Sequence, residues 1–250
     1  MSLNLEITMK EKFIEAIKEE LFSQKFCCYA CLGEKINDDK KFLCDDCYNK
    51  LEIISHCCKK CGDKVGEFDS YCNNCKDNQK IFDKVVCFAK LNDTSKSLIY
   101  RLKYGKKKYV ASAIAYFLVK KFNESFIQEE NADKIDYIVS VPITRNKLKE
   151  RGFCHTDEIA KDFASKIGID ILENLIIRVK DNLEQTKLNR EMRRKNLLNA
   201  YVIQDNANLE GKNILIIDDV YTTGATMDAI AQLLKNKGAN KVFGLAFCHS

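Results

Sequence analysis

Pairs of cysteines separated by two residues recur four times in the first third of the chain. They are Cys28 and Cys31, Cys44 and Cys47, Cys58 and Cys61, and Cys72 and Cys75. Each pair can place two thiolates on one side of a tight turn at the ~2.3 Å zinc–sulfur distance, and two such pairs complete a tetrahedral site. The spacing therefore predicts two structural zinc ions per chain.

The order of the pairs bears on how they combine. Twelve residues separate the first two pairs and ten separate the last two, which favours pairing in chain order, while nested pairing stays open. The alternative is a disulfide framework, which is typical of small secreted domains. The amino terminus lacks the apolar core of a secretory signal, so we expect a reducing, cytoplasmic environment. A redox C-x-x-C is disfavoured, because four such motifs follow one another.

Two adjacent carboxylates near the carboxyl terminus carry a second kind of chemistry. Asp218 and Asp219 follow the apolar stretch 214–217, which predicts a short buried strand, and the helical period resumes from Met227 onward. Backbone N–H groups in a Gly/Thr loop at a helix amino terminus bind phosphate. Carboxylates beside such a loop suit a polyol or a magnesium-bound sugar phosphate. The unit therefore predicts a sugar-phosphate site.

Residues 214–226 resemble the 5-phosphoribosyl-1-pyrophosphate (PRPP) motif of type I phosphoribosyltransferases. In that family the two acidic residues, here the candidate catalytic pair Asp218 and Asp219, hold the ribose hydroxyls. The loop that wraps the 5′-phosphate corresponds here to Tyr221, Thr222, Thr223, Gly224, Ala225 and Thr226. Many members carry a smaller aliphatic residue in place of Tyr221, which implies a narrower pocket or a ring that stacks on a ligand. The resemblance implies Mg²⁺ with PRPP.

A second strand-loop-helix unit lies in the middle of the chain. The mostly apolar stretch 135–141 predicts a strand, and a helix is expected from its cap Thr156 to Gly168. In a phosphoribosyltransferase the loop between them would bind pyrophosphate. The candidate residues are Ser140, Val141, Pro142, Ile143, Thr144 and Arg145. The alternative is a solvated basic turn.

The sequences VPITRNKLKERGF, from residue 141, and QTKLNREMRRKN, from residue 185, resemble those of the ComF family of competence proteins. Its members join an amino-terminal zinc module to a phosphoribosyltransferase-like domain, and the four cysteine pairs match this organisation. After RGF, members usually carry Asn-Gln, whereas this chain has Cys154 and His155. A catalytic Cys–His dyad is disfavoured, because adjacent residues on a helix do not face each other.

Positive charge is concentrated in residues 76–124, which hold twelve Lys and Arg against four Asp and Glu. Cations there alternate with tyrosines, a combination that binds single-stranded DNA through phosphate contacts and base stacking. The candidate residues are Tyr100, Arg101, Lys103, Tyr104, Lys106, Lys107, Lys108 and Tyr109, with a second basic patch at 190–195. The alternative is a solvated basic helix. The family resemblance favours DNA.

These units predict an α/β protein, with a type I phosphoribosyltransferase-like parallel sheet and an amino-terminal double zinc-ribbon module. The expected division is a helix over residues 1–25, the zinc-binding module over 26–78 and the phosphoribosyltransferase-like domain over 79–250. Residues 185–196 are expected to close over the site. No apolar run approaches the ~20 residues of a membrane span, so we expect a soluble protein without a transmembrane segment.

The resemblance implies a cytoplasmic protein of natural transformation that binds single-stranded DNA and PRPP during DNA uptake. Other competence proteins are further candidate partners, through which it could reach the inner face of the membrane. Two alternatives stay open. One is a Mg²⁺-dependent phosphoribosyltransferase, a pentosyl glycosyltransferase, acting on an unidentified base; the other is a non-enzymatic adaptor that binds proteins through its zinc module. An acceptor-base pocket would identify the enzyme, and the sequence does not reveal its residues.

Overall fold

The computed structural model describes residues 27–33, 42–105, 107–127, 133–180, 199–204 and 208–250. By its contacts the chain divides into two compact units, Met1–Leu51 and Glu52–Ser250. The second group of four cysteines thus shares a unit with the α/β domain, while the predicted boundaries at residues 25 and 78 stay predictions. The predicted helix over 1–25, Lys106, the predicted closing loop 185–196 and the basic patch 190–195 lie outside the described residues.

The first unit contains the turn after Cys28 and the short helix α2 (Asp45–Asn49). Cys44 is the amino-terminal cap of α2, and Asp45 and Asp46 lie in its first turn, where the helix dipole favours negative charge. Cys47 lies in the same helix and is buried. The turn at Cys44 therefore places two thiols close together.

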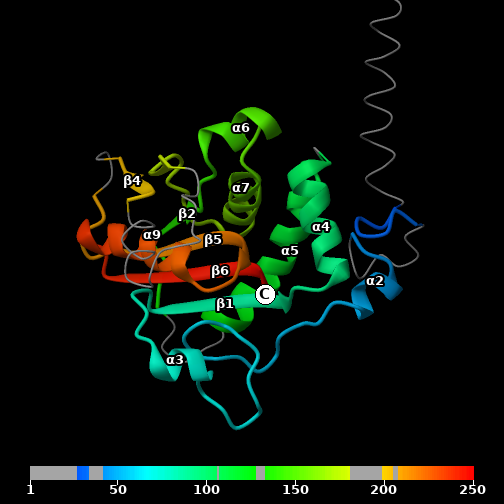
Figure 1. Cartoon of the computed structure of the whole chain (residues 1–250), viewed down its shortest axis with the longest axis horizontal. Coiled ribbons are helices and arrows are strands. Elements are labelled where there is room, and N and C mark those ends of the chain that lie inside the picture. The colour runs from blue at the N-terminus through cyan, green and yellow to red at the C-terminus, as the bar shows by residue number, and fades with distance from the viewer. Residues whose placement is uncertain (1–26, 34–41, 106, 128–132, 181–198, 205–207) are drawn as a thin grey trace, which may run out of the picture. The chain divides into compact units, whose positions relative to one another are not determined.

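The second unit is built on a parallel sheet with the strand order β1-β6-β5-β2 (Figure 1). β1 spans Lys84–Lys90, β2 Tyr137–Ser140, β5 Asn213–Tyr221 and β6 Lys241–His249. The interiors of β5 and β6 are buried without the alternation of a half-exposed strand, because helices cover both faces of the sheet. The predicted parallel α/β fold class is confirmed.

Helices α5 (Val110–Phe122) and α7 (His155–Ile167) pack together on one face of the sheet. There the ring of Phe88 on β1 stacks with Phe117 of α5 and Phe247 of β6, with centroids 5.0 and 5.9 Å away. Helix α9 (Ala225–Asn236) packs against the sheet in a core that also contains Ile214 and Ile216 of β5. Its buried residues include Met227, Ile230 and Leu234, as the helical period predicted.

Smaller elements connect these layers. Helix α4 (Asp93–Tyr104) begins with a capping box between Asn92 and Ser95, and the π-helical segment η2 (Asn123–Ile127) follows α5. Helices α3 (Asn73–Asp77) and α6 (Arg145–Arg151) are short, and β3 (Ile176–Arg178) pairs antiparallel with β4 (Tyr201–Ile203). None of the described helices combines the length and the apolar character that crossing a bilayer requires.

Strand β5 extends beyond the predicted stretch 214–217 through both aspartates to Tyr221. The reason is its neighbour β6, which is equally long and keeps the parallel register, with Asp218 opposite Ala246. The two carboxylates therefore belong to the rigid end of a strand and not to the loop that follows it.

The predicted start of α7 is wrong by two residues. The helix begins at His155 with Cys154 as its cap, whereas Thr156 was expected to cap it. The Thr156 hydroxyl instead donates a hydrogen bond to the carbonyl oxygen of Val141 at 2.6 Å. This bond ties the first turn of α7 to the loop after β2 and brings His155 into the helix.

Candidate functional site

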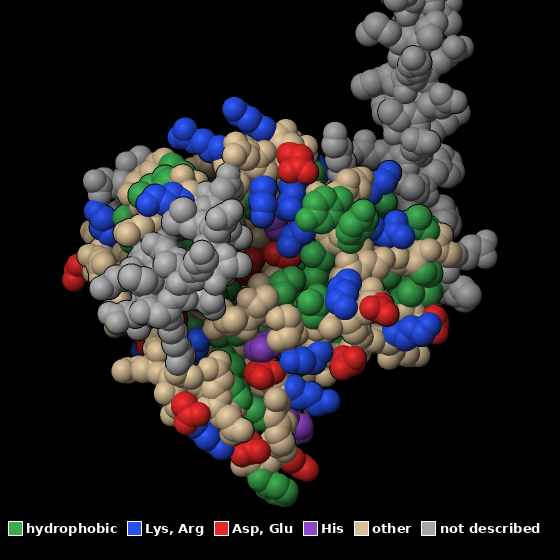
Figure 2. Space-filling model, in the orientation of Figure 1, with side chains coloured by type: hydrophobic (Ala, Val, Ile, Leu, Met, Phe, Trp, Pro, Cys, Tyr) green, Lys and Arg blue, Asp and Glu red, His purple; other side chains and the backbone are tan. Residues whose placement is uncertain are grey.

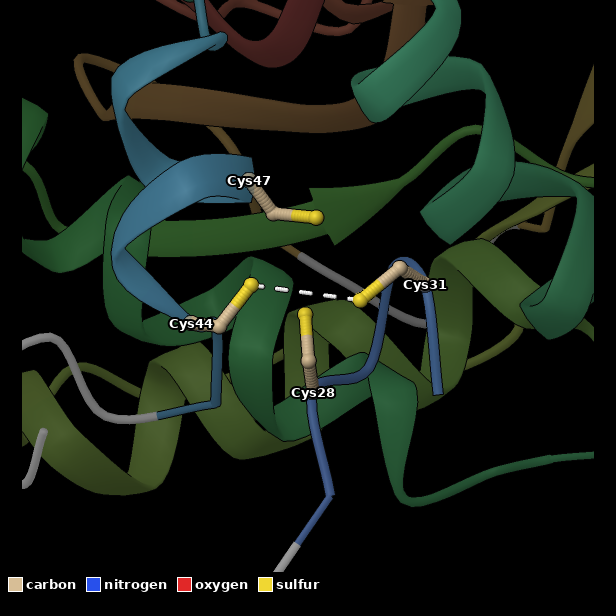
Figure 3. Close-up of side chains that lie close together, drawn as sticks. All are labelled: Cys28, Cys31, Cys44 and Cys47. Carbon is tan, nitrogen blue, oxygen red and sulfur yellow. Dashed lines mark hydrogen bonds between the residues drawn. The ribbon is translucent and has the colours of Figure 1, made fainter. Parts of the chain in front are cut away.

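The eight thiols of the C-x-x-C pairs converge into two clusters. In each cluster the four sulfur atoms lie within 4.8 Å of one another: Cys28, Cys31, Cys44 and Cys47 form one, and Cys58, Cys61, Cys72 and Cys75 form the other. Figure 3 shows the sulfurs of the first cluster facing a common space. The predicted pairing in chain order is confirmed.

Both clusters are built from the same local parts. The backbone N–H of the first cysteine donates to the carbonyl oxygen five residues further on, at 2.8 Å in both cases, and the third cysteine caps a short helix. The first cysteines are Cys28 and Cys58, and the third ones are Cys44 and Cys72. One sequence pattern, used twice, therefore gives two sites of similar architecture.

The chemistry of these thiols fits zinc. Burial raises the pKa of Cys28 and Cys58, but backbone hydrogen bonds outweigh it and lower both values to about 7, which favours the thiolate that binds metal. The sulfurs of Cys61 and Cys72 lie 3.6 Å apart, close to the edge of about 3.8 Å in a tetrahedron with ~2.3 Å zinc–sulfur bonds. None of the thirteen cysteines, all of which are described, forms a disulfide. Each cluster can hold one zinc ion.

A polar cavity of about 180 Å³ opens in the second unit at the carboxyl ends of β2 and β5. Ligands of open parallel sheets bind at this edge. Figure 2 shows a hollow with acidic side chains at its bottom and Lys and Arg side chains beside them. The cations that line the cavity are Lys103, Lys147, Arg151 and Arg178. The cavity therefore suits a ligand that carries several negative charges and hydroxyl groups.

Asp218 and Asp219 lie at the bottom of this cavity and differ in their electrostatic surroundings. Asp219 Oδ2 forms a salt bridge with Nζ of Lys103 at 2.5 Å. Burial raises the pKa of Asp219, but the hydrogen bond to His155 and the charge of Lys103 outweigh it and hold the pKa well below its usual range. Burial, and then the charge of Asp219, raise the pKa of Asp218 well above its usual range. The negative charge of the pair is thus held on Asp219.

His155 is fixed in one protonation state by its neighbours. Nη1 of Arg151 lies 3.1 Å from Nδ1 of His155, and because a guanidinium can only donate, Nδ1 accepts and the ring proton sits on Nε2. Nε2 then donates to Asp219 Oδ1 at 3.3 Å. Burial lowers the pKa of His155 from 6.5, although Asp219 opposes this, so the ring is neutral at pH 7. His155 thus orients Asp219 without adding a charge.

The loop between β5 and α9, the predicted phosphate loop, has a backbone that only glycine allows at one position. Gly224 has a φ of 78° and a Cβ there would collide with the Tyr221 side chain, so glycine is required. Thr226 lines the cavity, whereas Thr222 and Thr223 are exposed. Ala225 opens α9, whose first-turn N–H groups have no acceptor within the helix. The loop therefore presents donors and the positive end of a helix dipole.

The Tyr221 side chain supports this loop from the protein core. It is buried, and its ring packs against Phe82 and His249 with centroids 6.2 and 5.0 Å away. It is not among the residues that line the cavity. This position gives the ring a packing role, while the part of Tyr221 in ligand binding stays a prediction.

The predicted pyrophosphate loop is divided between cavity and scaffold. Val141, Pro142 and Ile143 line the cavity. The Ser140 hydroxyl is hydrogen-bonded to the Asp157 carboxylate, Thr144 is buried as the cap of α6, and Arg145 is exposed. The loop also starts α6, which brings two cations from outside the predicted loop, Lys147 and Arg151, to the cavity.

The predicted DNA-binding segment is also divided. Tyr100 and Tyr104 of α4 are 64% and 54% exposed, and their ring centroids lie 5.1 Å apart. Lys107 is exposed, whereas Lys103 points into the cavity toward Asp219. Lys108 pairs with Glu158 at 2.9 Å. The neighbouring rings of Tyr100 and Tyr104 and the charge of Lys107 therefore remain exposed on the surface.

Tyr104 connects this surface to the cavity. The Arg151 guanidinium lies 5.0 Å from the centre of the Tyr104 ring, with Nη2 3.4 Å from the tyrosine hydroxyl, and it also contacts His155. The structure thus identifies functional candidates that the sequence did not: Lys147, Arg151, His155, Arg178 and Tyr201. The basic stretch 147–151 was a signal for Lys147 and Arg151, and the departure from Asn-Gln at 154–155 was one for His155. Arg178 and Tyr201 had no such signal in the sequence.

Several known proteins are similar to this chain over most of its length. The chain is 27% identical over 225 residues to competence protein F of Haemophilus influenzae, covering 88% of this chain and 96% of that protein. It is 27% identical to the DNA utilization protein YhgH of Salmonella typhi, covering 83% and 90% of the two chains. It is 26% identical to the competence protein ComFC of Bacillus subtilis, covering 81% of each.

Residues 148–249 match the family of the phosphoribosyl transferase domain. A solved structure of adenine phosphoribosyltransferase from Saccharomyces cerevisiae is 18% identical, with a TM-score of 0.35 over 57% of this chain and 71% of that chain. The chain thus contains a phosphoribosyl transferase domain and two four-cysteine clusters, and it is similar over most of its length to competence protein F and ComFC.

Proposed function

We propose that this protein handles single-stranded DNA during natural transformation and binds PRPP in the cavity at the carboxyl edge of its sheet. The names of its relatives, two competence proteins and a DNA utilization protein, support the first part. One observation carries the second part. Asp218 and Asp219, the start of α9 and several cations meet in a single cavity of a phosphoribosyl transferase domain.

Each part of PRPP finds a chemical partner in this arrangement. The loop that ends at Gly224 offers N–H groups and the helix dipole to the 5′-phosphate. Asp219, held ionised, accepts hydrogen bonds from ribose hydroxyls, and Asp218, with its raised pKa, can also donate one. Lys147 and Arg151 lie where they can neutralise the pyrophosphate. Donors and cations for the phosphates thus lie in the same cavity as the aspartates that would bind the sugar.

Magnesium accompanies PRPP in this proposal. Asp219 is the residue whose ionised carboxylate suits a hard cation, since magnesium prefers oxygen ligands and keeps several of its waters. When bound, the ion would supply charge neutralisation to the pyrophosphate. Zinc is assigned to the two cysteine clusters, where four thiols surround each site.

Single-stranded DNA is assigned to the surface around α4. The exposed pair Tyr100 and Tyr104 offers rings on which successive bases can stack, and the adjacent Lys107 offers a phosphate contact. This surface borders the cavity through the contact between Tyr104 and Arg151. The two ligands would therefore occupy adjoining sites.

A second candidate function is a Mg²⁺-dependent phosphoribosyltransferase. Arg178 and Tyr201 line the same cavity, with the guanidinium 5.6 Å from the ring centre, and could bind a planar acceptor beside the ribose. In that reaction the bond from the anomeric carbon to pyrophosphate breaks, and pyrophosphate leaves with the electron pair. The acceptor nitrogen forms the new bond and loses its proton.

Two measurements on the zinc-loaded full chain separate these functions. Calorimetric titration with PRPP and Mg²⁺ should show saturable binding, and its absence would contradict the proposed ligand. Pyrophosphate release is then followed with no addition, with a panel of bases and with single-stranded DNA. Release that requires one base would favour the transferase, whereas binding without release under any of these conditions supports the binding function.

A further inference from the structure

The second cysteine cluster and the phosphate loop are neighbours in the fold, although they lie far apart in the sequence. Residues 76–83 run from the last cysteine of that cluster, Cys75, to the first sheet strand, β1. On the way they contact the loop that follows β5 and the first turn of α9. We call residues 76–83 the connecting segment.

Three contacts join the connecting segment to the phosphate loop. Nζ of Lys80 donates to the carbonyl oxygen of Thr223 at 2.9 Å. The backbone N–H of Ile81 donates to Oδ1 of Asp228, in the first turn of α9, at 2.8 Å. Phe82, which is fully buried, packs edge to face against Tyr221. The two ends of the loop, Tyr221 and Asp228, are therefore both held by one short stretch of chain.

The cysteine cluster also shares a buried core with the loop. Cys58 and Cys61 belong to the same buried core cluster as Tyr221 and Ile230. Gly62, in the turn between the cysteine pairs, lies so close to β1 that a Cβ there would be 2.8 Å from the carbonyl oxygen of Val85. The second cysteine cluster thus packs against the part of the sheet that carries the phosphate loop.

The other cluster is arranged differently. Cys28, Cys31, Cys44 and Cys47 lie in the unit Met1–Leu51, whereas Cys58, Cys61, Cys72 and Cys75 lie in the unit that contains the cavity. Two sites with the same local architecture therefore belong to different units, and among the described residues Cys58 and Cys61 of the second site share a hydrophobic core with Tyr221 of the phosphate loop.

We infer that the second cluster, when it holds zinc, positions the phosphate loop, and that the first cluster has no such role. A metal ion bound by four cysteines on two separate turns holds those turns together. Loss of the metal would release one end of the connecting segment and with it the contacts to Thr223 and Asp228. This inference rests on the proposed function only in expecting that the loop binds phosphate.

Hydrogen exchange tests the inference without any ligand. In the full chain, Cys72→Ser with Cys75→Ser should remove one zinc ion and speed amide exchange of residues 223–228 about tenfold or more, because two hydrogen bonds are released. The matched control, Cys44→Ser with Cys47→Ser, should remove the other zinc ion and leave exchange of 223–228 at the parent rate. Parent exchange rates in the first variant, with its zinc gone, would overturn the inference.

A second pair of variants keeps both metals. Lys80→Met with Asp228→Ala removes two of the three contacts and should leave two zinc ions while exchange of residues 223–228 becomes severalfold faster. Lys76→Met is the control, because its partner Asp69 lies 3.7 Å away on the exposed surface. If exchange is unchanged in the contact variant, the connecting segment does not hold the loop, even where the cysteine variant fails to fold.

PRPP affinity of the same variants separates this inference from the proposed function. Parent protein that binds no PRPP contradicts the proposed function, and the exchange data still decide whether the cluster positions the loop. If the parent binds, affinity should fall about tenfold or more in the Cys72→Ser/Cys75→Ser variant and stay near the parent value in the Cys44→Ser/Cys47→Ser variant.

Discussion

His155 donates a hydrogen bond from Nε2 to Oδ1 of Asp219 at 3.3 Å. It can do so because its other ring nitrogen, Nδ1, accepts a hydrogen bond from Arg151. The histidine lies on α7 and the aspartate on β5, so the contact connects the loop-helix unit after β2 with the strand that carries the acidic pair. Lys103 reaches the second oxygen of the same carboxylate from α4. Asp219 is therefore held in an ionised state by three elements, and its orientation depends on all of them.

The neutral state of His155 predicts a pH dependence of stability. Its pKa in the folded protein is below the ordinary value of 6.5, so the unfolded chain takes up a proton first as the pH falls. Stability should therefore decline below pH 6.5 in the parent, by at most about 1.4 kcal/mol per pH unit from this group. His155→Gln, which keeps a donor toward Asp219 but cannot titrate, should lose less.

Urea unfolding of the two proteins between pH 5 and 8 measures this difference, because Asp218 and His249 are common to both and cancel. The parent should become less stable relative to the variant only on the acidic side. A difference that is constant across the whole range would mean that His155 does not titrate below its ordinary pKa. His155→Ala should weaken PRPP binding more than His155→Gln does.

The two aspartates should respond differently to amide substitution. Asp218→Asn replaces a group whose raised pKa already favours the neutral form, so thermal stability at pH 7 should be nearly unchanged or higher. Asp219→Asn removes the partner of Lys103 and should cost on the order of 2 kcal/mol, less than for a fully buried pair because 21% of the lysine side chain is exposed. Calorimetric unfolding compares them. Equal losses would contradict the assignment of the charge to Asp219.

Metal content follows from the two clusters. The purified protein should contain two zinc ions per chain. Cys28→Ser with Cys31→Ser should leave one, because these substitutions remove two of the four ligands of the first cluster and none of the second. Elemental analysis of protein prepared under reducing conditions gives the count. Disulfides in place of zinc in such a preparation would show that the cysteines form a covalent framework.

Charge and stacking in the α4 region should be separable by salt. Neutralising Lys106 and Lys107 to Gln should reduce the slope of log affinity for single-stranded DNA against log salt by about 0.7 for each lost phosphate contact. Tyr100→Leu with Tyr104→Leu should instead cost about 1–3 kcal/mol for each base that stacks, with the slope unchanged. Fluorescence anisotropy from low to high salt measures both.

The control for the lysines is Lys161→Gln, a change on α7 where the parent lysine pairs with Glu173 at 2.6 Å. It should leave both the affinity and the slope near the parent values. If the lysine and tyrosine variants also bind like the parent, this segment is a solvated face, and DNA would have to bind elsewhere on the chain.

Local patterns account for much of the site. Four C-x-x-C pairs at short intervals specify two clusters, because a short loop can bring only neighbouring pairs together. Likewise the apolar stretch, the two aspartates and the Gly/Thr loop specify a strand, its carboxyl end and a helix start, all within residues 213–226. In each case the residues that act together are close in sequence.

The tertiary structure decided which distant residues complete that site. Lys103 was predicted as a DNA contact from its neighbours on α4, and only the packing of α4 near the sheet edge turns it toward Asp219. His155 looked like an unpaired departure from a family motif until α7 placed it between Arg151 and the same carboxylate. Local periodicity shows which face of a helix is apolar, but it does not say against which strand that face packs. The charge state of Asp219 therefore had to come from the fold, since it depends on burial and on partners that the chain brings together only when folded.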